Sequence, residues 1–184
     1  MKKPQKISNL QAKKIMSCDN ETVRVACRIM YETGLRVSDT LQLTMENIKS
    51  GSVIEKKTKK KKELKLSDET LKEIGDLTFE SKRGLLFRQK RNPNWAMNRS
   101  TLYKALKEVA DQLGIKVSPH SFRHLYAQNI YAVGHNVEMV RKALQHKYIE
   151  TTLNYLNLEE DETGPEKETV WDKIKNLIAR FLKF

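Results

Sequence analysis

The segment HSFRH, residues 120 to 124, places two histidines and an arginine at the expected start of a helix. Ser118 and Pro119 precede it as a natural N-cap and first helical residue. His120 and Arg123 are three residues apart and therefore project from the same face of the helix. The first turn also offers free backbone N–H groups and the positive end of the helix dipole. These features favour a bound anion, most obviously a phosphate, although the residues alone also allow an exposed basic helix start with no function.

A metal site is a second chemistry to weigh for the same segment. His120 and His124 have the i, i+4 spacing of a zinc-binding pair. However, no Glu follows His120 as in the H-E-x-x-H pattern, and no thiol lies nearby in the sequence. We therefore predict no metal and no other cofactor.

The elements that must position these residues can be predicted from apolar spacing and from capping residues. Helices are expected to start at Ser8, Asp19 or Asn20, Ser67, near Leu102, Ser118, Asn136, and Thr151 or Thr152. Two short strands, Ser52 to Lys57 and Glu63 to Leu66, are joined by a lysine run over residues 56 to 62, and Leu85 to Phe87 is a candidate third strand. Arg36 falls just past the helix that Gly34 ends, beside a turn that Ser38 and Asp39 can cap. The predicted fold class is α+β, mostly helical, with a small antiparallel β-hairpin on one side.

The composition indicates a single basic domain. The chain has 184 residues, and its 35 Lys and Arg against 23 Asp and Glu give a net charge of +12. Such a charge favours a polyanionic partner, nucleic acid first and an anionic membrane surface second, although solubility alone could explain it. Cys18 and Cys27 do not form a disulfide framework, and no signal peptide or membrane span is evident. These features predict a cytoplasmic protein.

Two further segments share the order and spacing of a known set of motifs. They are YETGLRVSDTLQL, residues 31 to 43, and LQHKYIETTLNY, residues 144 to 155, in which Tyr155 follows His146 by nine positions. Together with HSFRH they resemble the tyrosine recombinase (phage integrase) family, whose motifs are T-G-L-R-x-S-E/D, H-x-L-R-H, and L-G-H followed by a tyrosine. The resemblance covers roughly residues 8 to 158 and implies an integrase-like catalytic domain.

The resemblance assigns a role to each matched residue. Arg36 and Arg123 match the two arginines that hold the non-bridging oxygens of a scissile phosphate, for which a bidentate guanidinium is well suited. His120 matches a histidine that assists proton transfer or positions the nucleophile, and His146 matches a hydrogen-bond donor to the phosphate. Tyr155 matches the nucleophile. Without the resemblance, a helical tyrosine among leucines indicates a core residue.

The family also uses a lysine on a β-hairpin as general acid, and Lys57, followed by Thr58, is the best match here. The neighbouring lysines are predicted to contact DNA phosphates, which adds affinity and no base specificity; they are Lys56, Lys59, Lys60, Lys61 and Lys62. A solvated run of lysines is the alternative for these neighbours.

The chain departs from the family pattern in three places. Gln145 replaces the usual Gly before His146, where an added side chain could alter the turn, and Phe122 replaces Leu before Arg123. Only about thirty residues precede the Arg36 motif, whereas family members carry an N-terminal DNA-clamping domain of about a hundred residues. The chain is therefore expected to be either an excised catalytic domain or a minimal recombinase.

The resemblance implies a site-specific DNA recombinase or integrase that acts through a 3′-phosphotyrosine without metal or ATP. The alternatives are a topoisomerase IB-like or end-resolving enzyme, and a DNA-binding accessory protein with a vestigial site. The expected organisation is a catalytic domain over residues 1–158, an acidic linker over 159–168 and an amphipathic helix over 169–184. The expected partners are double-stranded DNA and other copies of the chain, in a tetramer in which this helix docks in trans, with no membrane and a nucleoid-associated location.

Overall fold

The computed structural model describes residues 6–77 and 84–156, with positions 154 and 155 described by their backbone alone. The predicted linker over 159–168 and the predicted C-terminal helix over 169–184 lie outside these residues. Within them, the elements in chain order are α1 (Asn9–Ile15), α2 (Glu21–Thr33), α3 (Val37–Thr40), α4 (Met45–Ser50), β1 (Ser52–Ile54), β2 (Lys61–Glu63), α5 (Asp68–Leu77), α6 (Arg99–Gln112), α7 (Pro119–Gly134), α8 (Val137–Leu144) and α9 (Ile149–Leu156). The fold is thus mostly helical with one small antiparallel pair of strands, as predicted.

The caps predicted for the first helices are present. Ser8 and Gln11 form a reciprocal capping box at the start of α1, and Asn20 caps α2 by accepting from the backbone N–H of Val23. The expected capping of the next turn by Ser38 and Asp39 is wrong, because Asp39 lies inside α3 and Arg36 occupies its N-cap. Asp39 is buried, and its Oδ1 instead accepts from the backbone N–H of Lys56 at 3.0 Å.

The hairpin forms with a shorter first strand and an earlier second strand than predicted. Ser52 pairs with Glu63 and Ile54 pairs with Lys61, so the lysine run enters the second strand. The second strand therefore lies closer to the N-terminus than the strand expected at Glu63 to Leu66. Val53 and Lys62 form the buried pair at the centre of the hairpin. The candidate strand at Leu85 to Phe87 is reduced to a single isolated bridge, between Thr44 and Leu85.

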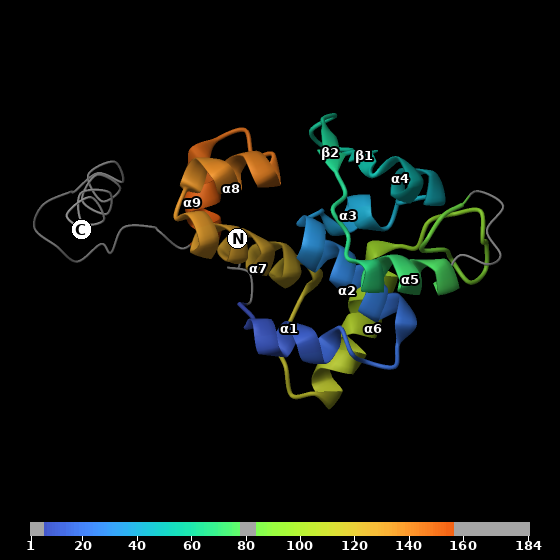
Figure 1. The fold of residues 1–184 in the computed structure, drawn as a ribbon. Helices are drawn as coiled ribbons and strands as arrows, with labels where there is room; N and C mark the ends of the chain where they lie inside the picture. The colour runs from blue at the N-terminus through green and yellow to red at the C-terminus, as the bar shows by residue number, and fades with distance from the viewer. Residues whose placement is uncertain (1–5, 78–83, 157–184) are drawn as a thin grey trace, which may run out of the picture.

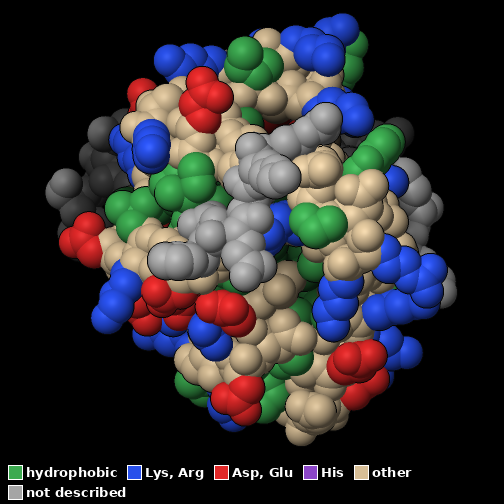
Figure 2. Space-filling view, turned by 90° about the vertical axis from the view of Figure 1, so that its right-hand side faces the viewer, with side chains coloured by type: hydrophobic (Ala, Val, Ile, Leu, Met, Phe, Trp, Pro, Cys, Tyr) green, Lys and Arg blue, Asp and Glu red, His purple; other side chains and the backbone are tan. Residues whose placement is uncertain are grey.

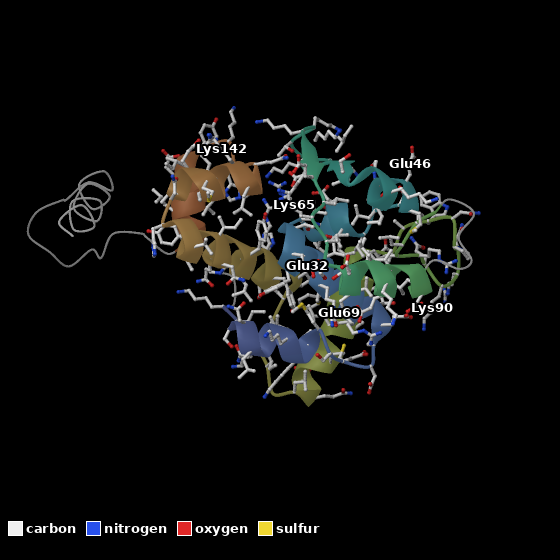
Figure 3. The ribbon with its side chains drawn as sticks, in the orientation of Figure 1. Glu32, Glu46, Lys65, Glu69, Lys90 and Lys142 are labelled. Atoms are coloured by element: carbon white, nitrogen blue, oxygen red, sulfur yellow. The ribbon has the colours of Figure 1, made fainter. Side chains whose placement is uncertain are left out.

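Hydrogen bonds tie α5 to α2. Ser67 caps α5 by accepting from the backbone N–H of Thr70 at 3.3 Å, as its position in the sequence predicted. Glu32 on α2 accepts from the Ser67 backbone N–H and from the hydroxyls of Ser67 and Thr70 at 2.7–2.9 Å. Glu32 and Glu69 mark this junction in Figure 3.

The elements before residue 118 form one half of the fold, and the helices after it, α7, α8 and α9, form the other half. Pro119 is the first residue of α7, as predicted, and Asn136 caps α8 by accepting from the Met139 backbone N–H. The last described helix, α9, starts at Ile149, two or three residues before the predicted start at Thr151 or Thr152. Figure 1 shows α8 and α9 on one side of α7, with the β-hairpin across from α8.

Two apolar clusters stabilise these halves. The larger one unites α1, α2, α5, α6 and the start of α7, and includes Ile29, Leu106 and Phe122. The smaller one joins the rest of α7 to α8 and α9 through Ala127 and Val140, among others. Because α7 contributes to both clusters and packs closely against α2, it is the common spine of the molecule.

The surface charge is mixed on the side of the molecule that carries α4 and α5. Figure 2 shows this face, on which acidic side chains are interspersed with lysines and arginines. Within the described part of the chain, no helix combines the length and the apolar character that crossing a membrane requires.

Candidate active site

A cleft of about 670 Å³ opens between the β-hairpin, the start of α7 and the connection from α8 to α9. Its lining includes five of the six residues predicted to act on a phosphate, namely Arg36, Lys57, His120, Arg123 and His146. These five come from four segments that are far apart in the sequence. Tyr155, the sixth, belongs to α9, the helix that follows the cleft's last loop, and its side chain lies outside the described atoms.

A buried carboxylate links the two arginines of this cleft. Arg36 donates from Nη1 to Oε2 of Glu55 at 2.6 Å, and the Glu55 side chain is completely buried. Nη1 of Arg123 lies 3.8 Å from the other oxygen, Oε1. Glu55 therefore orients Arg36 and offsets part of the positive charge beneath the cleft. The sequence alone does not reveal this role, because an acid at the start of a lysine run has no distinctive local signal.

Hydrogen bonds to backbone carbonyls hold the Arg123 side chain in place. Its guanidinium is 1% exposed and donates to the backbone carbonyls of Gly34 and Leu144, the latter at 2.7 Å. The chain reaches this position only with glycine at residue 34, whose φ is +64° and whose hypothetical Cβ would lie 2.2 Å from the Tyr126 ring. The glycine of the T-G-L-R motif thus brings a carbonyl against Arg123.

The surroundings of the cleft favour the neutral form of both of its histidines. Burial, followed by the positive charges of Arg123 and Arg36, lowers the pKa of His146 to about 4. The same causes, in the same order, lower the pKa of His120 below its ordinary value. The Nδ1 atom of His146 lies 3.0 Å from Oγ1 of Thr152 on α9. If the Thr152 hydroxyl donates to Nδ1, the tautomer carries its proton on Nε2 and can donate to an anion in the cleft.

The lysines of the hairpin divide into exposed and buried ones. Lys57 and Lys60 are exposed and line the cleft, and Lys56, Lys59 and Lys61 are also exposed. Lys62 instead is 7% exposed, and its Nζ donates to the Ala143 carbonyl at 2.7 Å. Burial, followed by the charge of Arg123, lowers the pKa of Lys62 to about 8. The prediction that Lys62 contacts DNA phosphate is therefore wrong, because its ammonium is buried and bonded within the fold.

Gln145 keeps the turn that glycine usually makes at this place in the family. As the C-cap of α8 it has φ +53° and ψ +39°, the left-handed conformation, which costs a non-glycine residue roughly 1–2 kcal/mol. Its side chain lines the cleft beside Thr58, whose Oγ1 lies 2.9 Å from Gln145 Oε1. The expected disturbance of the turn is therefore absent, because the helix still ends in the conformation that glycine would adopt.

The cleft has further lining residues to which our sequence analysis gave no role. They are Thr58, Lys147, Tyr148 and Thr151. Tyr148 is 58% exposed and brings a second phenol to the cleft, with Lys147 Nζ 5.0 Å from the centre of its ring. Its position two residues after His146, inside the segment that resembles the family motif, is the sequence feature that could have indicated a place in the cleft.

Metal-binding side chains do not gather in the described residues. Among them, no group of three or more His, Cys, Asp or Glu could hold a metal ion. His120 lines the cleft, whereas His124 is 1% exposed and is not among the lining residues. The i, i+4 pair thus does not present both rings to the cleft.

Comparison with known proteins decides the family. The model of the phage integrase family matches residues 5–162. The chain belongs to the phage integrase family. The match covers all three motifs from which we inferred the resemblance.

The curated relatives include tyrosine recombinases from bacteria and archaea. Tyrosine recombinase XerD of Shewanella oneidensis is 28% identical over 174 residues, covering 84% of this chain and 57% of the relative. Tyrosine recombinase XerA of Pyrococcus horikoshii is 26% identical over 160 residues, covering 83% of this chain and 56% of the relative. The chain thus spans a little over half the length of these relatives.

Solved structures share the fold. The crystal structure of XerA recombinase has a TM-score of 0.71 at 19% identity, covering 97% of this chain and 65% of that one. The catalytic domain of bacteriophage HP1 integrase has a TM-score of 0.62 at 22% identity, covering 86% of this chain and 90% of that one. A XerH site-specific recombinase bound to palindromic difH substrate, in a post-cleavage complex, has a TM-score of 0.67 at 20% identity, covering 86% of this chain and 51% of that one. The integrase catalytic fold predicted from the sequence is therefore confirmed.

Proposed function

We propose that this chain is the catalytic domain of a site-specific DNA recombinase that cuts and rejoins DNA through a 3′-phosphotyrosine. The observation that carries this proposal is the convergence of Arg36, Lys57, His120, Arg123 and His146 on one cleft. A purely structural cluster has little reason to bring three cations and two histidines together, because the repulsion among the cations and the partial burial of these side chains are unfavourable unless an anion occupies the cleft. Membership of the phage integrase family supports the same reading.

The cleft suits the charge that develops during phosphoryl transfer. Arg36 and Arg123 would bind the non-bridging oxygens of a DNA phosphate, and their orientation is fixed in advance by Glu55 and by backbone carbonyls. Neutral His146 would donate a hydrogen bond to the same phosphate. Because these donors are already in place, little reorganisation is needed when the transition state forms.

The reaction would proceed by two exchanges of phosphate esters. The Tyr155 oxygen attacks the phosphorus while His120 assists removal of the phenolic proton, whose ordinary pKa is about 10. The bond to the 5′ oxygen breaks, and Lys57 protonates the leaving oxygen. A 5′-hydroxyl of a partner strand then attacks the phosphotyrosine, returns the phenol and reseals the DNA. One phosphodiester replaces another, so the cycle needs no ATP, and the arginines supply the charge stabilisation that a divalent metal provides in other phosphoryl-transfer enzymes.

Double-stranded DNA is the proposed partner, with the nucleoid as the proposed location. The net charge of +12 and the exposed lysines of the hairpin support sequence-independent phosphate contacts by Lys56, Lys59, Lys60 and Lys61. We propose a tetramer on DNA in which the segment over residues 169–184 docks on a neighbouring copy. The mass of the protein–DNA complex, measured with and without residues 164–184, tests this assembly, and an unchanged assembly after truncation contradicts docking in trans.

Trapping on a suicide DNA substrate tests the function. A nick near the cleavage point makes the piece of strand that carries the freed 5′-hydroxyl short enough to diffuse away. Religation is then impossible, so an active enzyme accumulates as a covalent adduct that is seen on denaturing gels. We expect the adduct with the unmodified chain and with Tyr148→Phe, and its loss with Tyr155→Phe while DNA binding persists. Binding without any adduct would instead support the vestigial accessory protein.

A plasmid with two target sites separates recombination from simple relaxation or end resolution. A recombinase exchanges strands between the two sites and therefore changes the connectivity of the plasmid. An enzyme of the topoisomerase IB type changes the supercoiling and leaves the connectivity intact. We expect the exchanged product.

A further inference from the structure

Gln145 combines an unfavourable backbone conformation with a side chain that is fully engaged. Three non-glycine residues have a positive φ among the described residues, and they are Lys59, His135 and Gln145. Gln145 and His135 both cap the C-terminal end of a helix, a place that favours glycine. A residue kept in a disfavoured conformation indicates that its side chain contributes something that glycine cannot.

The side chain of Gln145 connects α8 to the β-hairpin. Its Nε2 donates to the Lys61 carbonyl on β2 at 2.9 Å, and its Oε1 lies 2.9 Å from the Thr58 hydroxyl in the turn of the hairpin. Thr58 Oγ1 also lies 3.0 Å from Oε2 of Glu55, so one hydroxyl lies between the Gln145 amide and the carboxylate that holds Arg36. A third link, from Lys62 Nζ to the Ala143 carbonyl, joins the same two elements.

The hairpin needs such an attachment. Its strands have three residues each, and an isolated pair of such short strands is at best marginally stable in water. It belongs to the half of the fold built on the larger apolar cluster, whereas α8 belongs to the half built on the smaller one. Figure 3 marks α8 by Lys142, with the hairpin across from it. The contacts of Gln145 therefore fix the hairpin relative to the wall of the cleft that carries His146.

Lys57 depends on this attachment because it lies in the hairpin turn, next to Thr58. Its side chain is exposed and lines the cleft, and a long flexible side chain directs its ammonium to one atom only if its backbone is held in place. We propose that Gln145 is a positioning residue that holds the hairpin, and with it Lys57, over the bound phosphate. This inference rests on the proposed function, in which Lys57 protonates the leaving 5′ oxygen.

Gln145→Gly tests the proposal, because it removes the two side-chain contacts and relieves the backbone at once. The matched control is His135→Gly, which relieves the same left-handed conformation at the end of α7, at a residue that does not line the cleft. Each variant is assayed for single-turnover cleavage of two suicide substrates, one with the ordinary 5′ oxygen and one with sulfur in its place at the cleavage point. A thiolate leaves without protonation, so the second substrate does not need the general acid.

We expect Gln145→Gly to cleave the ordinary substrate at least about tenfold more slowly than the unmodified chain, since a general acid contributes a factor of roughly 10² to 10⁴. The sulfur substrate should be cleaved at the unmodified rate, and His135→Gly should cleave both substrates normally. Lys57→Ala should show the pattern of Gln145→Gly with a larger factor. Equal slowing of both substrates by Gln145→Gly, or no slowing of either, overturns the proposal.

Hydrogen exchange of the DNA-free protein tests the mechanical part independently of catalysis. The amides of Ser52 to Glu63 should exchange faster in Gln145→Gly and at the unmodified rate in His135→Gly. Unchanged exchange in Gln145→Gly overturns the inference whether or not the chain cleaves DNA. If the unmodified chain forms no adduct with either substrate, the proposed function fails, and with it the assigned role of Lys57, while exchange still decides whether Gln145 holds the hairpin.

Discussion

Replacing Glu55 by glutamine removes the negative charge beneath the cleft while keeping the shape of the side chain. In the unmodified chain, Glu55 is fully buried and bonded to Arg36 Nη1 at 2.6 Å, with Arg123 Nη1 3.8 Å away. Breaking a buried ion pair by removing one partner costs about 3–5 kcal/mol. Arg36 keeps 18% of its side chain exposed, and an amide oxygen can still accept its hydrogen bond. We therefore expect Glu55→Gln to lower the free energy of unfolding by about 2–3 kcal/mol in chloride.

The same substitution should strengthen the binding of an anion. At an effective dielectric constant of about 20, a unit charge roughly 6 Å from a bound anion contributes about 3 kcal/mol, and screening by salt lowers this value. We expect sulfate, as a substitute for the DNA phosphate, to bind Glu55→Gln about tenfold more tightly than the unmodified chain. At saturating sulfate this recovers about 1.4 kcal/mol of the lost stability.

Chemical denaturation across a sulfate titration at constant ionic strength measures both effects. Glu73→Gln is the matched control, because Glu73 is also a shielded acid, 18% exposed, paired with Arg24 at 3.0 Å and with Arg28 at 3.3 Å. It does not line the cleft, so its loss should destabilise the fold without any additional gain from sulfate. The reasoning is refuted if sulfate stabilises all three proteins equally, or if Glu55→Gln costs no stability.

Two further predictions concern His146 and Gly34. The pKa of His146 is about 4 in the fold and 6.5 ordinarily, so the unfolded chain binds the extra proton between these values. Stability should therefore fall as the pH drops from 6.5 to 4, by up to about 3 kcal/mol, and denaturation of His146→Asn should lack this part of the pH dependence. Gly34→Ala should lower the melting temperature more than Gly51→Ala does. Both glycines have a positive φ, but a Cβ at Gly34 meets the Tyr126 ring at 2.2 Å and a Cβ at Gly51 meets nothing within 4 Å. Equal melting temperatures for the two variants would contradict the close approach of Gly34 to Tyr126.

The sequence was sufficient for features that depend on local spacing. Pro119 at the start of α7 and the three-residue interval between His120 and Arg123 already predicted a helix with its cationic side chains near the N-terminus. Asn20 and Asn136 likewise indicated helix starts through short-range capping. The family motifs then predicted that distant segments contribute to one site, because the order and spacing of these motifs reflect one shared fold.

Features that depend on contacts between distant residues were beyond the sequence. Lys62 looks like its exposed neighbours in the lysine run, and only the pairing with Val53 places it on the inner face of the hairpin. Glu55 acquires its role from Arg36, nineteen positions away, and from Arg123 on another helix. Gln145 appeared to be a departure that could disturb a turn, since its partners Thr58 and Lys61 lie more than eighty residues away in the chain.

Mass spectrometry of the protein–DNA adduct tests the central claim most directly. After nuclease and protease digestion of an adduct formed on suicide DNA, the peptide that carries the residual nucleotide can be sequenced by fragmentation. We predict a 3′-linked nucleotide on Tyr155, on the helix next to the cleft formed by Arg36, Arg123 and His146. A nucleotide on Tyr148, the other phenol at the cleft, or the absence of any nucleotide-bearing tyrosine from a chain that binds this DNA, would contradict the account.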